Sequence, residues 1–259
     1  MKRFLLWLGL LLTAVPGAVR AGTADSLRVL FIGNSYTYYN DLPSMVRQIA
    51  STQRMKLSCT RVVKGGERLS GHLKNERLLE LLARGGWDYV VIQEQSTAPA
   101  RPTEQVARET YPAARTLDSL AHAGSPDVRV IYYMTWGHKY GSVYPTHGYR
   151  RIENYEGMQE RLITSYLEMT YANGGWCAPA GMAWRRVRHE RPDCLLYCQD
   201  CFHPSAAGSY LVANVIFTTI AQRPYQTDFT AGLPAEQAEY LQRTAQRTVL
   251  DNRALLNLP

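Results

Sequence analysis

The stretch "RVLFIGNSYT", Arg28 to Thr37, runs an apolar block directly into Gly33-Asn34-Ser35. An apolar run of this length that ends at a glycine predicts a buried strand over residues 27–32. In an α/β protein, the loop that follows such a strand lies at the edge of the sheet where ligands bind. A serine at this position is therefore a candidate for chemistry rather than an ordinary turn residue.

Apolar runs alternate with helical patterns along the rest of the chain, which is typical of a parallel sheet covered on both faces. Further strands are predicted over residues 57–63, 89–92, 128–134 and 195–198, and helices over residues 42–52, 69–84, 103–122, 149–173, 205–221 and 234–250. Residues 179–189 are expected to be helical or irregular. The sequence therefore predicts one three-layer α/β/α domain with a mostly parallel central sheet, a core over residues 27–221 and a trailing C-terminal helix.

The first 21 residues have the three-part plan of a secretory signal peptide. Lys2 and Arg3 precede an apolar run over residues 4–12, and small residues lead to Ala21. The apolar run is too short to span a bilayer. We expect cleavage after Ala21, which leaves residues 22–259 as an exported domain, periplasmic or extracellular; a retained N-terminal anchor is the alternative.

The net charge argues against a nucleic-acid partner. The 29 basic residues become 26 once Lys2, Arg3 and Arg20 are removed, whereas all 22 acidic residues remain. This mild excess forms no basic run or stripe. We expect no nucleic-acid partner and no stable membrane insertion after cleavage, while the oligomeric state stays open.

Five cysteines raise the questions of disulfides and metal. An odd number leaves at least one thiol unpaired, and the pairing is not readable from the sequence. Three of them lie near His203, which suggests zinc, but their spacings of four and three residues do not make the pair of Cys-x-x-Cys knuckles that structural zinc sites use. We therefore expect no metal, and favour a disulfide or plain packing for this cluster. The cysteines are Cys59, Cys177, Cys194, Cys198 and Cys201.

Near the C-terminal end, the segment "DCFHPS" places Asp200 three residues before His203. A serine needs a base to take its proton, and an imidazole acts best as that base when a carboxylate fixes its tautomer. One Asp-x-x-His turn can supply both groups, although the same string also occurs as a helix cap.

Taken together, "FIGNSYT" and "DCFHPSAAGSYLVA" resemble the two ends of the SGNH (GDSL-type) hydrolases. That family begins with a strand ending in Gly-Asp-Ser or Gly-Asn-Ser and finishes with Asp-x-x-His, a proline and a glycine-containing helix. The phrases "GNSYT", "WDYVVIQEQS" and "YYMTWG" are similar to a little-characterised branch of exported bacterial members. The resemblance implies a flavodoxin-like fold with no metal or organic cofactor. It also implies Ser35 as nucleophile, His203 as general base and acid, and Asp200 as the residue that orients His203.

The resemblance also implies an oxyanion hole, in which two or three donors point at one oxygen. The Ser35 amide can serve, because it opens the turn into the following helix, where backbone N–H groups lack partners. The family places a glycine after the second strand, and in "VVKGGERL" we expect Gly66, with Gly65 as the alternative.

The third donor of the family is an asparagine in a Gly-x-Asn-Asp segment after the third strand. Here that position reads Gln93-Glu94-Gln95-Ser96, without asparagine. A glutamine amide donates the same kind of hydrogen bond from a longer side chain. We expect Gln93 to be the third donor, because it continues the strand directly into the cleft, with Gln95 as the alternative.

Trp136 and His138 follow the fourth strand and are expected, with Gln95, to line a sugar-sized pocket; aromatic packing under a loop is the alternative. The other histidines are expected to be surface or capping residues: His72, His122, His147 and His189. The sequence as a whole predicts an exported serine esterase that hydrolyses small ester groups, with carbohydrate O-acetyl esters as the favoured substrate. The alternatives are a lipase-like or aryl esterase, and a non-catalytic glycan-binding protein on a hydrolase fold.

Overall fold

The computed structural model describes residues 26–142 and 150–259, so the predicted signal peptide and His147 lie outside the described residues. Its centre is a five-stranded sheet in the order β2-β1-β3-β4-β5, and every pairing is parallel. The strands are β1 (Leu27–Gly33), β2 (Leu57–Val63), β3 (Tyr89–Ile92), β4 (Arg129–Tyr133) and β5 (Trp176–Ala178).

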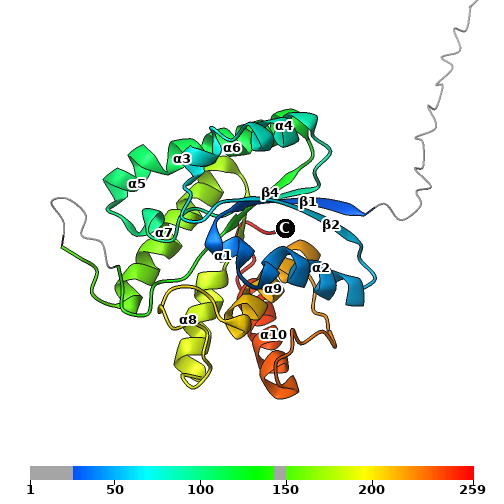
Figure 1. Ribbon diagram of the computed structural model, residues 1–259, viewed down its shortest axis with the longest axis vertical. Coiled ribbons are helices and arrows are strands. Elements are labelled where there is room, and N and C mark those ends of the chain that lie inside the picture. The colour runs from blue at the N-terminus through cyan, green and yellow to red at the C-terminus, as the bar shows by residue number, and fades with distance from the viewer. Residues whose placement is uncertain (1–25, 143–149) are drawn as a thin grey trace, which may run out of the picture.

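Helices cover both faces of this sheet (Figure 1). One face carries α3 (Leu69–His72), α4 (Glu76–Arg84), α5 (Thr103–Glu109), α6 (Tyr111–Gly124) and α7 (Tyr155–Asn173). The opposite face carries α2 (Leu42–Thr52), α8 (Ala180–Glu190), α9 (Ala206–Ala221) and α10 (Ala235–Leu250). The predicted three-layer α/β fold is therefore confirmed.

Helix α9 is the central helix of its layer. It contacts α2, α8, α10 and β5, and it is buried along almost its whole length. This explains why its sequence is apolar all round rather than on one face only. Ser205 caps its first turn, because the Ser205 hydroxyl accepts a hydrogen bond from the Gly208 N–H.

The fifth strand differs from the prediction. Residues 195–198 form no strand, since Tyr197 makes only an isolated bridge with Pro204. The sheet instead ends at β5, which pairs with β4 over three residues. So short an apolar run directly after Gly174 and Gly175 has no periodicity of its own. Only its pairing with β4 makes it a strand.

Two of the long predicted helices are each divided in two. The helix predicted over residues 69–84 stops at His72 and restarts at Glu76, because the Asn75 side chain caps the second segment by accepting from the Leu78 N–H. The helix predicted over residues 103–122 breaks at Thr110, where Pro112 in the first turn of α6 has no N–H to continue α5.

The strand order creates one crevice. The chain leaves β1 for β2 on one side and returns to β3 on the other, so the loops after β1 and β3 diverge at the carboxyl end of the sheet. In open α/β sheets this switch point is where ligands bind. The short helices α1 (Ser35–Tyr38), η1 (Tyr39–Asp41) and η2 (Ala98–Ala100) lie in these two loops.

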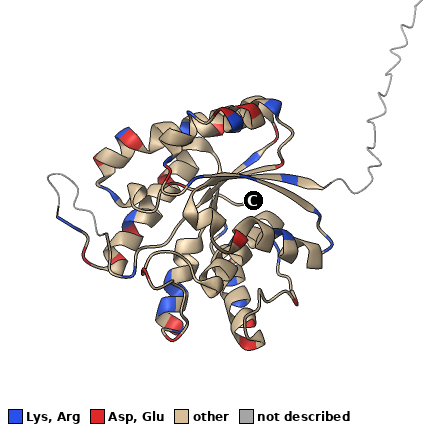
Figure 2. Cartoon of the chain, in the orientation of Figure 1, with Lys and Arg blue, Asp and Glu red and all other residues tan. Residues whose placement is uncertain are grey.

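Positions of acidic and basic residues are distributed over all the layers of the fold (Figure 2). Acidic and basic residues alternate along α4, whereas α10 carries Glu236 and Glu239 in its first half and Arg243 and Arg247 in its second. Within residues 26–142 and 150–259, no helix is long and apolar enough to cross a membrane.

Candidate active site

Ser35, His203 and Asp200 lie in hydrogen-bonding contact. The Ser35 Oγ is 2.8 Å from His203 Nε2, and His203 Nδ1 is 2.7 Å from Asp200 Oδ2. Ser35 opens the short helix after β1, whereas the other two residues lie in the loop that leads into α9. The structure thus brings together the three residues in the arrangement that nucleophile, base and orienting carboxylate require.

The Asn34 side chain holds the turn around Ser35. Its Oδ1 accepts a hydrogen bond from the Tyr36 N–H at 3.2 Å, and its Nδ2 donates to the Glu67 carbonyl at 3.1 Å. The first bond caps the short helix, and the second ties the turn to the loop after β2. This agrees with the expectation that Asn34 has a structural rather than a chemical part in the site.

Gln93 does not fit its predicted part as an oxyanion donor. It is fully buried, and its Oε1 accepts hydrogen bonds from the Asn34 N–H and the Thr37 hydroxyl. Its Nε2 donates to Asn34 Oδ1 and to the Glu94 carbonyl, which uses both amide hydrogens. A Cβ on Gly33 would lie 2.5 Å from Gln93 Oε1, so the glycine makes room for this amide. Gln93 therefore supports the nucleophile turn from beneath.

Gln95 keeps an amide hydrogen free. Its Oε1 accepts from the Thr97 N–H, the Thr97 hydroxyl and the Ala98 N–H, so the carbonyl end is fixed in the loop. The Nε2 makes one long contact of 3.4 Å with Ser96 Oγ. The alternative third donor thus has the freedom that Gln93 lacks.

Gly66 and the Ser35 amide suit the other two donor positions. Gly66 has φ +68°, a backbone conformation that glycine adopts without strain. Gly65, the alternative, packs closely on α1, because a Cβ there would lie 3.2 Å from the Tyr38 hydroxyl. Neither the Ser35 N–H nor the Gly66 N–H has an acceptor within the described part of the chain.

The Asp200–His203 loop is held by its own backbone. Asp200 Oδ1 accepts from the N–H groups of Phe202 and His203, at 3.1 and 3.0 Å. Partial burial would raise the pKa of Asp200, but these bonds and the His203 side chain outweigh it and hold that pKa below its usual range. The carboxylate is therefore ionised at neutral pH, as an orienting group for an imidazole must be.

Asn40 joins the two halves of the site, a part that the sequence did not indicate. Its Nδ2 lies within hydrogen-bonding distance of the Pro204 carbonyl, the Ser205 carbonyl and the Ser209 hydroxyl, at 3.2, 3.1 and 2.8 Å. The loop after β1 is thereby fastened to the start of α9. Asn40 has φ 52°, a conformation that asparagine tolerates better than most residues.

Aromatic rings surround the His203 imidazole. Tyr39 stacks on it with ring centroids 4.2 Å apart and planes 3° from parallel, and Phe202 lies 4.3 Å away on a tilted plane. Tyr36 meets it edge-on at 5.8 Å. The His203 side chain is only 15% exposed as a result, which restricts its rotation and excludes much of the water around it.

Trp136 does not line an open pocket. It is fully buried, stacked between Tyr36 at 4.5 Å and Trp184 at 4.0 Å, and its Nε1 donates to the Phe202 carbonyl. The alternative, aromatic packing under a loop, is therefore the correct description. The stack supports both the nucleophile helix and the Asp200–His203 loop.

His138 lies beside the triad but is also buried, with 6% of its surface exposed. Its Nε2 is 3.2 Å from Ser96 Oγ, and its ring packs against Phe202. Burial, and then the neighbouring His203, lower the pKa of His138 to about 4, so the imidazole is neutral at physiological pH. The predicted sugar-sized pocket between Trp136 and His138 is therefore not present.

His72 is a core residue rather than the surface or capping residue expected. It is 1% exposed, and its Nε2 lies 2.8 Å from the Gly33 carbonyl. Because a carbonyl only accepts, the Nε2 carries the hydrogen. His72 thus fixes the last residue of β1, directly before the nucleophile turn. His122 and His189 contact the carboxylates of Asp118 and Glu156, with 41% and 61% of their side chains exposed.

The cysteines are free thiols, Cys201 included. The disulfide favoured for the cluster is therefore absent, and Cys198 instead contacts the Pro204 carbonyl. Within residues 26–142 and 150–259, no three histidine, cysteine or acidic side chains are arranged to hold a metal ion.

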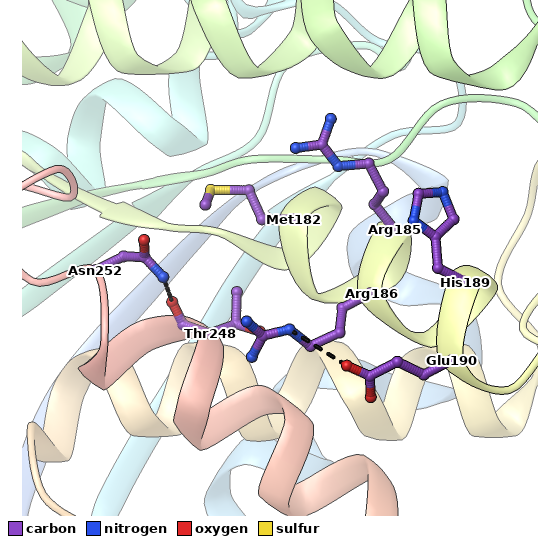
Figure 3. A pocket seen from close by; sticks show the side chains of 7 residues that line it. All are labelled: Met182, Arg185, Arg186, His189, Glu190, Thr248 and Asn252. Atoms are coloured by element: carbon purple, nitrogen blue, oxygen red, sulfur yellow. Dashed lines mark hydrogen bonds and ion pairs between the residues drawn. The ribbon is translucent and has the colours of Figure 1, made fainter.

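A cavity of about 330 Å³ between α8 and α10 lies apart from the loops that carry the triad (Figure 3). Figure 3 shows Arg186 and Glu190 pointing toward each other, with nitrogen and oxygen 3.8 Å apart. Arg185 and His189, which also line it, pair with Glu160 and Glu156. Each of these basic groups lies near a carboxylate, although the buried Nη1 of Arg186 has no hydrogen-bond partner among the described residues.

Glu94 is a buried carboxylate with 1% of its surface exposed. Burial raises its pKa to about 7, although hydrogen bonds from the Gln95 and Leu69 N–H groups and the charges of Arg68 and Arg101 act in the opposite direction. This group therefore titrates near neutral pH, and its ionised form is the one that destabilises the fold.

Replacing Glu94 with glutamine should change how stability depends on pH. Because the folded-state pKa lies above the ordinary value of 4.5, the stabilisation from proton binding is complete below pH 4.5 and is lost as the pH rises through 7. At 1.36 kcal/mol per pKa unit, the loss is at most about 3 kcal/mol. From pH 4.5 to pH 8, the wild type should therefore lose about that amount of unfolding free energy, whereas Glu94→Gln should not. Urea unfolding of both proteins at the two pH values measures the difference.

The control for this measurement is Glu239→Gln, whose carboxylate lies on α10 with 67% of its side chain exposed. This variant should follow the wild type at both pH values. If Glu94→Gln also ran parallel to the wild type, burial would not be shifting the titration of Glu94.

No protein-family model and no curated protein matches this chain. Solved structures do match it. A DUF4886 family protein from Bacteroides uniformis is 17% identical, with a TM-score of 0.72 over 87% of this chain and 95% of that one. A protein from Slackia heliotrinireducens, titled "a putative SGNH hydrolase", is 29% identical, with a TM-score of 0.60 over 76% of this chain and 100% of that one.

An acetylxylan esterase from Geobacillus stearothermophilus is also similar in fold. It is 16% identical, with a TM-score of 0.57 over 78% of this chain and 97% of that one. These structures therefore share the arrangement of sheet and helices described above.

Proposed function

Because this chain belongs by its fold to the SGNH hydrolase superfamily, we propose that it is a serine esterase that hydrolyses small ester groups, with carbohydrate O-acetyl esters as the substrate class. The observation that carries the proposal is the contact of Ser35 Oγ with His203 Nε2, backed by Asp200. A protein that only bound glycans would have no need of this arrangement.

In the proposed reaction, His203 Nε2 takes the Ser35 proton while Ser35 Oγ attacks the ester carbonyl carbon. Asp200 accepts a hydrogen bond from Nδ1–H and stabilises the imidazolium that forms. The imidazolium then protonates the departing alcohol, which leaves an acyl group on Ser35. A water molecule gives its proton to His203 and attacks this acyl group, and Ser35 regains its proton as the acid leaves.

The negative oxygen of each tetrahedral intermediate needs donors. We assign this part to the N–H groups of Ser35 and Gly66 and to the Gln95 amide, which replaces Gln93 in that position. All three have hydrogens without an acceptor, or with only one long contact, in the described residues. Such preorganised donors often contribute the largest single share of an esterase's rate.

The acetyl and carbohydrate parts of the proposal rest on different support. The acyl size draws on the rings of Tyr36, Tyr39 and Phe202, which pack around His203 and which we propose restrict the acyl group to a small one. The carbohydrate part draws on the acetylxylan esterase of similar fold. The buried Trp136 lends no support to a carbohydrate substrate.

Export belongs to the same proposal. Its support is the signal-peptide plan of residues 1–21, with Lys2, Arg3 and the small residues before Ala21. The partner we propose is thus a glycan ester outside the cytoplasm, and we propose no nucleic-acid partner because the mature chain would be only mildly basic.

The test uses the mature chain, residues 22–259. Its hydrolysis of p-nitrophenyl acetate, butyrate and octanoate is compared with acetate release from acetylated xylo-oligosaccharides. We expect activity on acetyl esters to exceed that on longer acyl chains. Faster hydrolysis of octanoate would favour the lipase-like alternative.

A fluorophosphonate separates an enzyme from a binding protein, because it reacts only with an activated serine. We expect labelling of Ser35 in the wild type, detected by mass spectrometry, and none in His203→Ala, whose serine has no base. A wild type that is neither labelled nor active on any ester would support the glycan-binding alternative.

A further inference from the structure

The Glu94 side chain joins two loops of the site. Its Oε1 accepts hydrogen bonds from the Leu69 N–H at 3.1 Å and from the Gln95 N–H at 2.6 Å. Leu69 begins α3, at the end of the loop that contains Gly66, and Gln95 lies in the loop after β3. One carboxylate oxygen therefore links the backbone of the two loops that carry proposed oxyanion donors.

The buried position of this carboxylate needs an explanation. An ionisable group this deeply buried costs stability, and a neutral side chain would cost less. Arg68 and Arg101 lie near enough to act on its charge, yet both make their ion pairs with Glu109 instead. Glu94 is therefore not retained as one half of an ion pair, and its visible contacts are the two backbone N–H groups.

The same two loops are tied to the nucleophile turn by Asn34. Its side chain contacts the Glu67 carbonyl on one side and the Gln93 amide on the other. Glu94 connects the Gly66 loop directly to the Gln95 loop, so each of the three segments is bonded to the other two. All three segments that supply a donor are thus fixed to one another by buried or half-buried side chains.

Resting on the esterase function proposed above, we propose that Glu94 is a positioning residue that sets the spacing of the Gly66 and Gln95 loops, so that their donors converge on the oxyanion. Such donors act at 2.7–3.1 Å from the oxygen of the tetrahedral intermediate. A displacement of about 1 Å in such geometry can lower the rate about 10²-fold. Because the oxyanion exists only after attack, the loss should fall on kcat and not on KM.

The experiment measures kcat and KM for p-nitrophenyl acetate at pH 8 in three variants of Glu94. Glu94→Ala removes the acceptor, and we expect kcat to fall about 10²-fold while KM stays within about threefold of the wild type. Glu94→Asp keeps the charge but is one methylene shorter, so it cannot reach both N–H groups and should lose a similar amount. Glu94→Gln keeps an acceptor oxygen at the same length and should restore kcat to within about threefold of the wild type.

Glu109→Gln is the matched control. It removes a carboxylate from the same two arginines without touching either loop backbone, and its kcat and KM should equal those of the wild type. Thermal melts of every variant show which of them are folded at the assay temperature. If Glu94→Ala is unfolded, Glu94→Asp against Glu94→Gln carries the comparison.

Two outcomes overturn the inference. Wild-type kcat in folded Glu94→Asp or Glu94→Ala would show that the two loops keep their spacing unaided. A rise in KM with kcat unchanged would place Glu94 in substrate binding instead. Failure of the esterase proposal itself looks different, because the wild type would then be no faster than Ser35→Ala.

Discussion

Ser35→Ala should lower kcat/KM for p-nitrophenyl acetate by about 10⁴-fold or more, since it removes the atom that attacks the ester. The residue is 9% exposed, and among the described residues its hydroxyl bonds to His203 alone, so the substitution leaves the surrounding hydrogen bonds intact. His203→Ala should cost about as much, and the double variant little more, because the two residues act as one unit.

The rate that survives in Ser35→Ala should come from the oxyanion donors and from substrate binding. Ser58→Ala, on the exposed part of β2, is the matched control and should retain wild-type kinetics. Ester hydrolysis by folded Ser35→Ala at more than a tenth of the wild-type rate would refute Ser35 as the nucleophile.

Gln95→Ala should lower kcat by about 10²–10³-fold, the usual effect of losing one oxyanion donor. Its melting temperature should change little, because Gln95 is half-buried and its contacts are confined to the neighbouring residues Ser96 to Ala98. The readout is kcat for p-nitrophenyl acetate at saturating substrate, alongside a thermal melt.

Gln93→Ala is the contrasting variant. Its amide satisfies both Asn34 and Thr37 in the core, so the substitution leaves buried polar groups unpaired and should cost about 1–3 kcal/mol of unfolding free energy for each. The reverse result would identify Gln93 as the third donor. In that case Gln93→Ala would be as stable as the wild type but lose kcat, and Gln95→Ala would keep the wild-type kcat.

The triad could be predicted from the sequence because each of its residues lies in a recognisable local sequence pattern. Ser35 follows a wholly apolar strand, and Asp200 and His203 share one turn, so short-range patterns suffice to identify them. The three-layer fold was predictable for the same reason, since most of its strands and helices show a local pattern in the sequence. The fifth strand was not, because three residues are too few to show one.

The choice between Gln93 and Gln95 depended on packing that no local pattern contains. The Gln93 N–H bonds to the Ile32 carbonyl, so this residue still follows β3 and its side chain turns toward the core. Only the absence of a Cβ on Gly33, 60 residues earlier in the chain, makes space for it there. The burial of Trp136 has the same kind of cause. Tyr36 and Trp184, which enclose its ring, are distant in sequence, so no local pattern shows that Trp136 is buried.

The bond between Asn40 and the start of α9 has a consequence for how activity appears during folding. It joins residues 164 to 169 positions apart, and the contact between Ser35 and His203 spans 168. Contacts of such separation form late, because a long loop must first lose its freedom. A chain emerging from the ribosome thus holds Ser35 without its base until His203 has been made. The moment at which esterase activity appears would then report when folding of the chain is complete.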